Sequence, residues 1–153
     1  MSDDAKKRTL YEQVILDHNK NPRNCRLMPN PSCMSEGFNP LCGDQFTVFL
    51  KLEDDKIVDV SFQGCGCAIS KSSASIMTTV LKGKTKAEAE ALFQRFRDMV
   101  TSEPDAPDHA ADLGKLEVFC GVREYPVRVK CATLAWHTMI AALEGKNNPV
   151  STE

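Results

Sequence analysis

The sequence has little net charge, no long apolar run and a polar start. Its formal net charge is -2 over 153 residues, so no overall charge attracts nucleic acid or an anionic membrane. No segment is apolar for long enough to span a bilayer. The residues after Met1 are polar, unlike the apolar core of a secretory leader. We therefore expect a cytoplasmic protein that contacts neither nucleic acid nor membrane.

The common metal and nucleotide motifs are missing as well. The chain contains no C-x-x-C pair, no H-E-x-x-H, no G-x-G-x-x-G and no P-loop. Histidine occurs three times, and we expect His18 to be packed, His109 to be exposed and His137 to lie at the edge of the core. These absences argue against the commonest metal and nucleotide sites.

Cysteine, in contrast, occurs seven times, at positions 25, 33, 42, 65, 67, 120 and 131. An odd number in a reducing compartment argues against a disulfide framework. Metal binding, thiol chemistry or plain burial must therefore account for these thiols. The remaining composition, 42% apolar and 26% charged, is that of one globular domain over residues 1–153, with flexible tails at 1–8 and 146–153.

Periodicity and breaker residues predict several helices around one hairpin. We predict helices over residues 10–19, 68–82, 85–100, 112–122 and 131–144. Strands at 45–52 and 57–63 form an antiparallel hairpin, with Val58, Val60 and Phe62 pointing inward from the second strand. Irregular structure is expected at 23–40, 102–108 and 147–153.

Three short segments carry thiols at predicted junctions between these elements. They are Cys42-Gly43-Asp44, Gly64-Cys65-Gly66-Cys67 and Arg128-Val129-Lys130-Cys131. Three thiolates and one carboxylate would complete a tetrahedral zinc shell. Taken alone, the first segment is more typical of a loop with one buried cysteine and one turn-forming aspartate than of a metal site.

Two of these thiols have surroundings that favour a thiolate. Cys67 is predicted where a strand passes into a helix, and a helix N-terminus stabilises negative charge. Cys131 has the corresponding place before the last predicted helix, with the cations Arg128 and Lys130 beside it. For Lys130 we prefer a solvated position.

Long stretches of the chain resemble one known family. They include Asn39-Pro40-Leu41-Cys42-Gly43-Asp44-Gln45, Gly66-Cys67-Ala68-Ile69-Ser70, and Pro126-Val127-Arg128-Val129-Lys130-Cys131-Ala132-Thr133. On these motifs the chain resembles the SufU/IscU (NifU N-terminal-like) family of iron–sulfur cluster assembly proteins. The resemblance implies an α+β fold with a small, mostly antiparallel sheet and helices packed on one face.

The resemblance is closest to the zinc-dependent SufU branch, because Lys130 stands where the IscU scaffold branch has histidine. It implies a Zn2+ site formed by Cys42, Asp44, Cys67 and Cys131. It also implies that Cys42 takes sulfur from a SufS-type, PLP-dependent cysteine desulfurase and passes it to a downstream iron–sulfur scaffold. Arg128 would lie against the site as a second residue of this sulfurtransferase-like relay.

Three alternatives stay open. Gly64-Cys65-Gly66-Cys67 satisfies the patterns of both branches, so Cys65 is a second candidate ligand or acceptor, although we favour Cys67. The same ligands suit iron or a transient iron–sulfur cluster, as in an IscU-type scaffold. A zinc-stabilised interaction module without sulfur chemistry is the third. Cys25, Cys33 and Cys120 match no motif, and we expect them to be structural or exposed.

Overall fold

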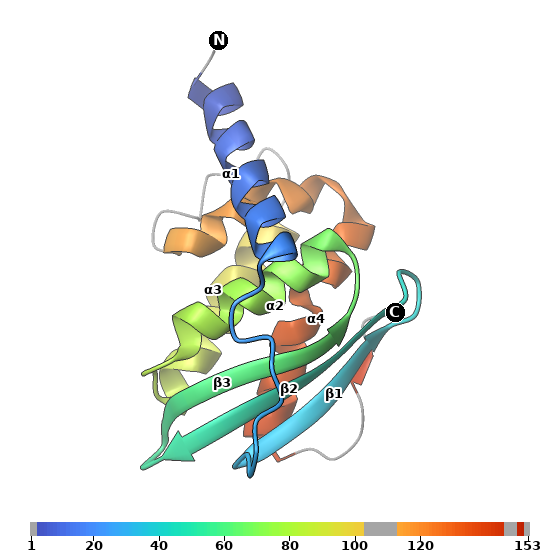
Figure 1. Cartoon of the computed structure of the whole chain (residues 1–153). Coiled ribbons are helices and arrows are strands. Elements are labelled where there is room, and N and C mark those ends of the chain that lie inside the picture. The colour runs from blue at the N-terminus through green and yellow to red at the C-terminus, as the bar shows by residue number, and fades with distance from the viewer. Residues whose placement is uncertain (1–2, 103–112, 146–149, 152–153) are drawn as a thin grey trace.

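The sheet and helices form two layers in the computed structural model, which describes residues 3–102, 113–145 and 150–151. The elements are α1 (Asp3–Lys20), β1 (Cys33–Asn39), β2 (Asp44–Glu53), β3 (Lys56–Cys65), α2 (Ala68–Leu81), α3 (Lys86–Thr101), the 3-10 segment η2 (Gly114–Glu124), α4 (Pro126–Leu143) and β4 (Val150–Ser151). The strand order is β3-β2-β1-β4, antiparallel except for the β1–β4 pair (Figure 1). The predicted α+β fold is confirmed.

The predicted hairpin is present as β2 and β3. The alternating side chains of β2 bury Phe46, Val48 and Leu50 completely. The prediction that Val58 points inward is wrong, because the register between the strands shifts after Lys51 and leaves Val58 half-buried. Ile57 fills the core in its place, at 0% exposure.

Two strands lie where irregular structure was predicted. Residues 33–39 form β1, which pairs with β2 along its whole length. Gly37 of β1 packs against α4 so closely that a Cβ atom there would collide with Thr138. The short β4 then pairs with β1 beside Gly37, inside the predicted C-terminal tail. At the other end, α1 begins at Asp3, within the predicted N-terminal tail.

The predicted helices are present, but α1 and α4 begin earlier than predicted, and the predicted 112–122 helix is the 3-10 segment η2. Thr85 caps α3 through the predicted capping box with Glu88. α4 begins at Pro126, whereas we predicted an extended segment up to Cys131. Proline is well suited to the first helical position, since its fixed φ fits a helix and its missing N–H is not needed there. Most of the predicted 102–108 loop, and His109, lie outside the described residues.

The helices α2 and α4 cover one face of the sheet, and an aromatic cluster joins them to α3. Trp136 of α4 is fully buried and stacks on Phe96, with ring centroids 5.0 Å apart. None of the helices within the described ranges is long and apolar enough to cross a membrane.

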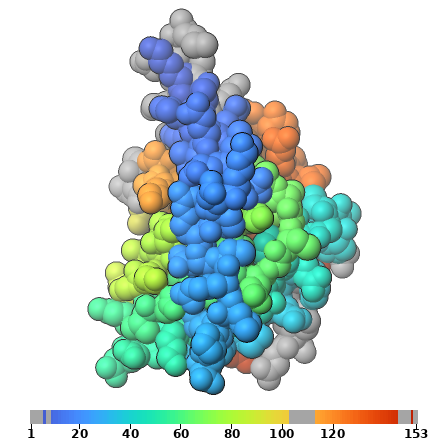
Figure 2. Space-filling view, in the orientation of Figure 1, coloured from blue at the N-terminus to red at the C-terminus, as the bar shows by residue number. Residues whose placement is uncertain are grey.

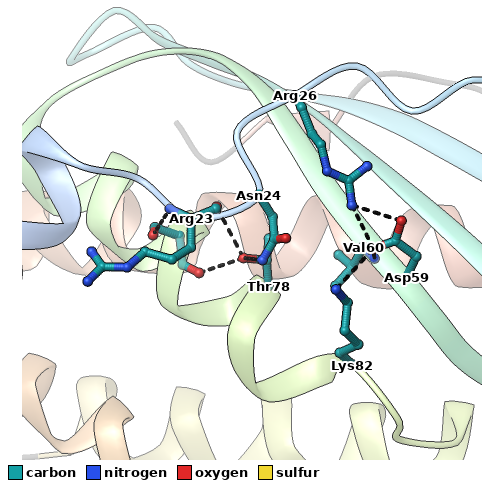
Figure 3. A network of polar contacts seen from close by, with 8 residues as sticks. Arg23, Asn24, Arg26, Asp59, Val60, Thr78 and Lys82 are labelled. Atoms are coloured by element: carbon teal, nitrogen blue, oxygen red, sulfur yellow. Dashed lines mark hydrogen bonds and ion pairs between the residues drawn. The ribbon is translucent and has the colours of Figure 1, made fainter.

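The lead-in, residues 21–32, crosses the opposite face of the sheet (Figures 1 and 2). Its backbone pairs with β3, where the Phe62 N–H donates to the Asn24 carbonyl at 3.0 Å. The Asn24 amide donates to Thr78 Oγ1 of α2 at 3.0 Å, and Arg26 forms an ion pair with Asp59 of β3 at 2.8 Å (Figure 3). These contacts fasten the lead-in to both layers.

Candidate metal centre

Three of the predicted ligands meet at one end of the sheet. Cys42 lies in the turn between β1 and β2, Asp44 opens β2, and Cys131 lies in the second turn of α4. One ligand atom from each lies within 4.8 Å of the others. The sulfurs of Cys42 and Cys131 are 3.3 Å apart, although 89 residues separate them in the chain.

Cys67 lies beside this group and caps α2. Its Sγ accepts a hydrogen bond from the Ser70 N–H at 3.5 Å. The same sulfur is 3.9 Å from Asp44 Oδ2, and the Cys67 N–H donates to Asp44 Oδ1 at 2.8 Å. Asp44 therefore links the hairpin turn to the start of α2. We call Cys42, Asp44, Cys67 and Cys131 the sulfur cluster.

Two glycines allow these segments to approach. Gly43 has φ of 71°, a left-handed conformation that turns the chain between Cys42 and Asp44. Gly66 stands where a Cβ atom would lie 2.7 Å from Asp44 Oδ1 and 2.5 Å from Ser70 Oγ. Any larger residue at position 66 would push the β3–α2 connection away from Asp44.

Cys65 lies on the other face of the sheet. Alternation along β3 turns Phe62 into the core and leaves Gln63 and Cys65 exposed. Cys65 pairs with Gln45 of β2 and lines a shallow hollow with Gln63. The geometry thus brings Cys67, rather than Cys65, to Asp44.

The three thiols of the sulfur cluster differ in how deeply they are buried. Cys42 is exposed, Cys67 is half-buried and Cys131 is 2% exposed. The prediction that Cys131 stands at a helix N-terminus is wrong, because α4 starts at Pro126 and Cys131 falls inside it. The unpaired N–H groups at the start of α4 therefore do not reach this sulfur.

The proton distribution among the thiols follows from their contacts. A hydrogen bond from the Cys131 thiol lowers the pKa of Cys67 to about 6, against the opposing effect of burial and with further help from the Ser70 hydroxyl and N–H. The pKa of Cys131 is raised, first because its proton is held toward Cys67 and then because the thiol is buried. Cys67 thus ionises more easily than Cys131 without a metal.

Arg128 is near the site in sequence, and its side chain lies over the ring of Tyr125. Its guanidinium carbon lies 4.8 Å from the centre of the Tyr125 ring. Within the described part of the chain, its side chain makes no hydrogen bond or ion pair with the sulfur cluster. The remaining cysteines, Cys25, Cys33 and Cys120, lie outside the cluster, exposed or half-buried.

Both described histidines serve the packing. His18 is buried, and its Nδ1 lies 2.7 Å from Ser75 Oγ of α2. The ring of His137 meets that of Phe93 edge-on, at 5.0 Å. These positions agree with the predicted packed and core-edge roles.

Sequence reasoning missed two polar neighbours of the cluster, Ser70 and Asn39. Ser70 contacts Cys67 through both its hydroxyl and its N–H. The Asn39 amide lies 3.5 Å from both Asp44 Oδ2 and Cys131 Sγ. Both residues fall within the motifs that carry the family resemblance, but a motif does not reveal which atoms touch.

The donor set fits zinc. Zinc–sulfur bonds of about 2.3 Å in a tetrahedron place two thiolates about 3.8 Å apart. The distance of 3.3 Å between the sulfurs of Cys42 and Cys131 lies close to that value. Cys42, Asp44 and Cys131 are therefore close enough to share one ion, and Cys67 lies beside them, 3.9 Å from Asp44 Oδ2.

The chain is similar to known proteins in both sequence and structure. The sequence profile of the NifU-like N-terminal domain matches residues 10–132. The chain is 43% identical over 150 residues to the zinc-dependent sulfurtransferase SufU of Bacillus subtilis (strain 168), covering 96% of this chain and 100% of that protein. It is 37% identical over 139 residues to the iron–sulfur cluster assembly scaffold protein IscU of Streptococcus pyogenes serotype M1, covering 91% of this chain and 86% of that protein.

A solved structure shares the fold along most of its length. It is the crystal structure of an iron–sulfur cluster assembly scaffold protein for the SUF system from Fervidobacterium islandicum AW-1. The TM-score is 0.80 at 36% sequence identity, covering 89% of this chain and 98% of that chain.

Proposed function

The chain belongs to the NifU-like N-terminal domain family, and on that premise we propose that it serves iron–sulfur cluster assembly as a zinc-dependent sulfur acceptor. The observation that carries the proposal is the convergence of two distant thiols and a carboxylate, with a third thiol beside them. The similarity to the zinc-dependent sulfurtransferase of Bacillus subtilis over nearly the whole chain supports it.

We assign the acceptor role to Cys42. It is the exposed thiol of the cluster, whereas Cys131 is buried in a helix that packs on the sheet. Its turn also contains Gly43, which has a left-handed backbone conformation. A Cβ atom at Gly43 would meet no other atom within 4 Å, so there is open space beside the turn. A sulfur acceptor must reach a partner's sulfur, and a surface turn permits that movement.

The transfer itself is a thiol exchange. Zinc bound by the cluster would keep its thiols deprotonated at neutral pH. The Cys42 thiolate attacks the outer sulfur of a cysteine persulfide on a desulfurase of the SufS type. A new S–S bond forms to Cys42, the S–S bond of the desulfurase breaks, and the desulfurase cysteine leaves as a thiolate. The persulfide proton moves with the transferred sulfur. Because one S–S bond replaces another, the step involves no net oxidation.

Apolar side chains at the same end of the molecule suit a docking partner. Leu41, next to the acceptor, is 65% exposed, and Tyr125 and Val127, at the start of the helix that carries Cys131, are 51% and 54% exposed. Exposed apolar and aromatic groups around a reactive thiol are typical of a contact surface. We therefore place the desulfurase over this rim, with the downstream scaffold as the later recipient of the sulfur.

A second candidate function is that of a cluster scaffold. The similarity to the Streptococcus and Fervidobacterium scaffold proteins favours it, and thiolates suit iron as well as zinc. In that case the same four residues would hold a transient iron–sulfur cluster instead of relaying sulfur.

Metal content is the first test. Freshly purified protein is expected to contain about one zinc per chain, because three thiolates and a carboxylate close the shell. Asp44→Ala and Cys131→Ser should lose it, whereas Cys65→Ser should retain it, since Cys65 lies on the other face of the sheet. Unchanged zinc in Asp44→Ala and Cys131→Ser would refute the site.

Persulfide mapping is the second test. The protein is incubated with a SufS-type desulfurase and free cysteine, and the added sulfur is located by peptide mass spectrometry. Cys42 should carry it, and Cys42→Ser should abolish both the label and the rise in desulfurase turnover. The matched control is Cys25→Ser, another exposed thiol outside the cluster. Sulfur on Cys131 with Cys42 unmodified contradicts the assignment. Formation of an iron–sulfur cluster on the protein, without any rise in desulfurase turnover, favours the scaffold function.

A further inference from the structure

Asn39 is a buried polar residue at the centre of the sulfur cluster. It is the last residue of β1, is 0% exposed, and pairs in register with Asp44, the first residue of β2. The turn that carries Cys42 lies between these two paired residues. Any shift of Asn39 would therefore move both ends of the turn.

The residue contacts three of the four members of the sulfur cluster. Its backbone carbonyl accepts the Cys42 N–H at 3.2 Å. Its Nδ2 lies 3.5 Å from Asp44 Oδ2 and 3.5 Å from Cys131 Sγ. An asparagine amide carries two N–H donors, so it can offer one to the carboxylate and one to the sulfur at the same time.

The other side of the amide is left without a partner. Asn39 Oδ1 is buried and finds no hydrogen-bond partner among the described residues. Exchanging the positions of the amide oxygen and nitrogen would not help, because it would direct an oxygen at a carboxylate and a sulfur, both electron-rich. The contacts with Asp44 and Cys131 therefore fix the orientation, at a cost to stability.

We propose that Asn39 is a positioning residue of the metal centre, which holds Asp44 and Cys131 as fixed ligands and leaves Cys42 as the thiol that moves. This inference rests on the proposed zinc site. Asp44 is held at both oxygens, by the Cys67 N–H on Oδ1 and by the Asn39 amide on Oδ2. Cys131 receives an N–H donor on its sulfur, which withdraws electron density from a thiolate and makes it a weaker nucleophile.

The sulfur of Cys42 receives no such contact from Asn39. Asn39 holds only the backbone of Cys42, through its carbonyl. Asn39 thus contacts the sulfur of Cys131 but not that of Cys42, although the two sulfurs lie 3.3 Å apart. Groups around a metal's ligands commonly act in this way, by fixing ligand orientation and donor strength.

The test compares Asn39→Asp with wild-type protein in zinc and cobalt binding. Asn39→Asp keeps the shape of the side chain but replaces the two donors with a carboxylate oxygen. Zinc affinity, measured by competition with a chromophoric chelator, should fall about 10- to 100-fold. In the cobalt-loaded protein, the thiolate-to-cobalt absorption band should shift, because the sulfur of Cys131 loses its hydrogen bond.

A matched control separates this role from a general effect of burial. Ser61 of β3 is also fully buried, and its Oγ likewise finds no partner among the described residues. Ser61→Ala should leave zinc affinity and the cobalt spectrum unchanged. If Asn39→Asp does not fold, as judged by circular dichroism, Asn39→Ser removes the amide without adding a charge and is measured in the same way.

The outcomes separate the two proposals. Zinc affinity and a cobalt spectrum equal to those of wild type in the folded Asn39 variant overturn the positioning role and leave the proposed function intact. An equal loss in Ser61→Ala also overturns it, because burial alone would then explain the effect. Wild-type protein that binds no zinc overturns the proposed function itself, and the role of Asn39 with it.

Discussion

The lead-in and the sulfur cluster are both polar networks that join distant segments, yet they are built differently. The lead-in lies largely at the surface, and its donors find acceptors: Arg26 meets Asp59, and Asn24 meets Thr78 (Figure 3). In the sulfur cluster, Asp44 and Cys131 are buried, the sulfurs of Cys42 and Cys131 lie 3.3 Å apart, Cys67 Sγ lies 3.9 Å from Asp44 Oδ2, and the neighbouring Asn39 Oδ1 has no partner in the described structure.

The difference indicates which network serves stability and which serves chemistry. Satisfied hydrogen bonds across a sheet face contribute to folding and need nothing further. A buried group of thiols and a carboxylate with an unpaired amide oxygen is a poor way to stabilise a fold, but it suits a bound cation. Changes to the lead-in should therefore alter stability alone, and changes to the cluster should alter metal binding as well.

Removal of the metal should have the largest effect. A ligand present at about 1,000 times its Kd stabilises the folded state by about 4 kcal/mol, which is roughly 10 °C in Tm for a domain of this size. Differential scanning calorimetry with and without a strong chelator measures this shift. Asp44→Ala should melt at the lower temperature in both conditions. A Tm that does not respond to the chelator would remove the contrast between the two networks.

Gly66→Ala should have the next largest effect. The new methyl group would lie 2.7 Å from Asp44 Oδ1 and 3.0 Å from a Phe46 ring carbon, so the connection must shift, at a cost of about 1–3 kcal/mol. Zinc affinity should fall at the same time, because Asp44 moves. Gly121→Ala is the control, since a methyl group there meets nothing within 4 Å. Equal urea midpoints for the two variants would show that the close approach at Gly66 does not matter.

Acid should lower the stability of the folded protein through His18 of α1, which lies just before the lead-in in the chain. Burial and then the nearby Arg23 lower the pKa of His18, so the unfolded chain binds a proton more readily than the folded chain. The free energy of unfolding should therefore fall as the pH drops below the ordinary histidine pKa of about 6.5. Urea denaturation between about pH 8 and about pH 5.5 measures this fall, with chelator present so that zinc release does not contribute.

His18→Gln should reduce that pH dependence without removing it. Burial also lowers the pKa of His137, and the contacts of Cys67 lower the pKa of that thiol to about 6, so both groups keep a slope of the same sign. An identical pH dependence in wild type and His18→Gln would show that the buried imidazole beside Ser75 does not titrate in this range.

Arg26→Ala should have the smallest effect. Its ion pair with Asp59 is substantially exposed, and such pairs contribute about 0.2–1 kcal/mol. Zinc content should stay unchanged, and the loss should shrink further at high salt. A loss of zinc in this variant would mean that the two networks are coupled.

The parts of the fold that were predictable carry their signals locally. The β2–β3 hairpin follows from alternation, and α3 follows from the capping box at Thr85. β1 escaped prediction because Gly37 and its neighbours have weak strand propensity, and their order comes from pairing with β2 and packing on α4. The start of α4 was misplaced because a proline fits an extended segment and a first helical turn equally well.

The candidate site also has features that could be predicted from the sequence and features that could not. The types of its ligands were visible in the sequence, and alternation from Phe62 already turns Cys65 away from the core. The contact of Arg128 with Tyr125, the capping role of Ser70 and the contacts of Asn39 were not visible, because each depends on side-chain geometry between elements. Which residues bind metal stays a prediction until metal content is measured.

The separation of 89 positions between Cys42 and Cys131 also bears on how the protein is made. Closing so long a loop costs chain entropy, and the contact cannot form until α4, the last long helix, has been synthesised. A nascent chain that ends before α4 has the hairpin and the β3–α2 connection but lacks one sulfur. At the proposed site, stable metal capture would therefore be a late event in biosynthesis, and a chain loaded with metal would be one in which folding has reached its C-terminal helix.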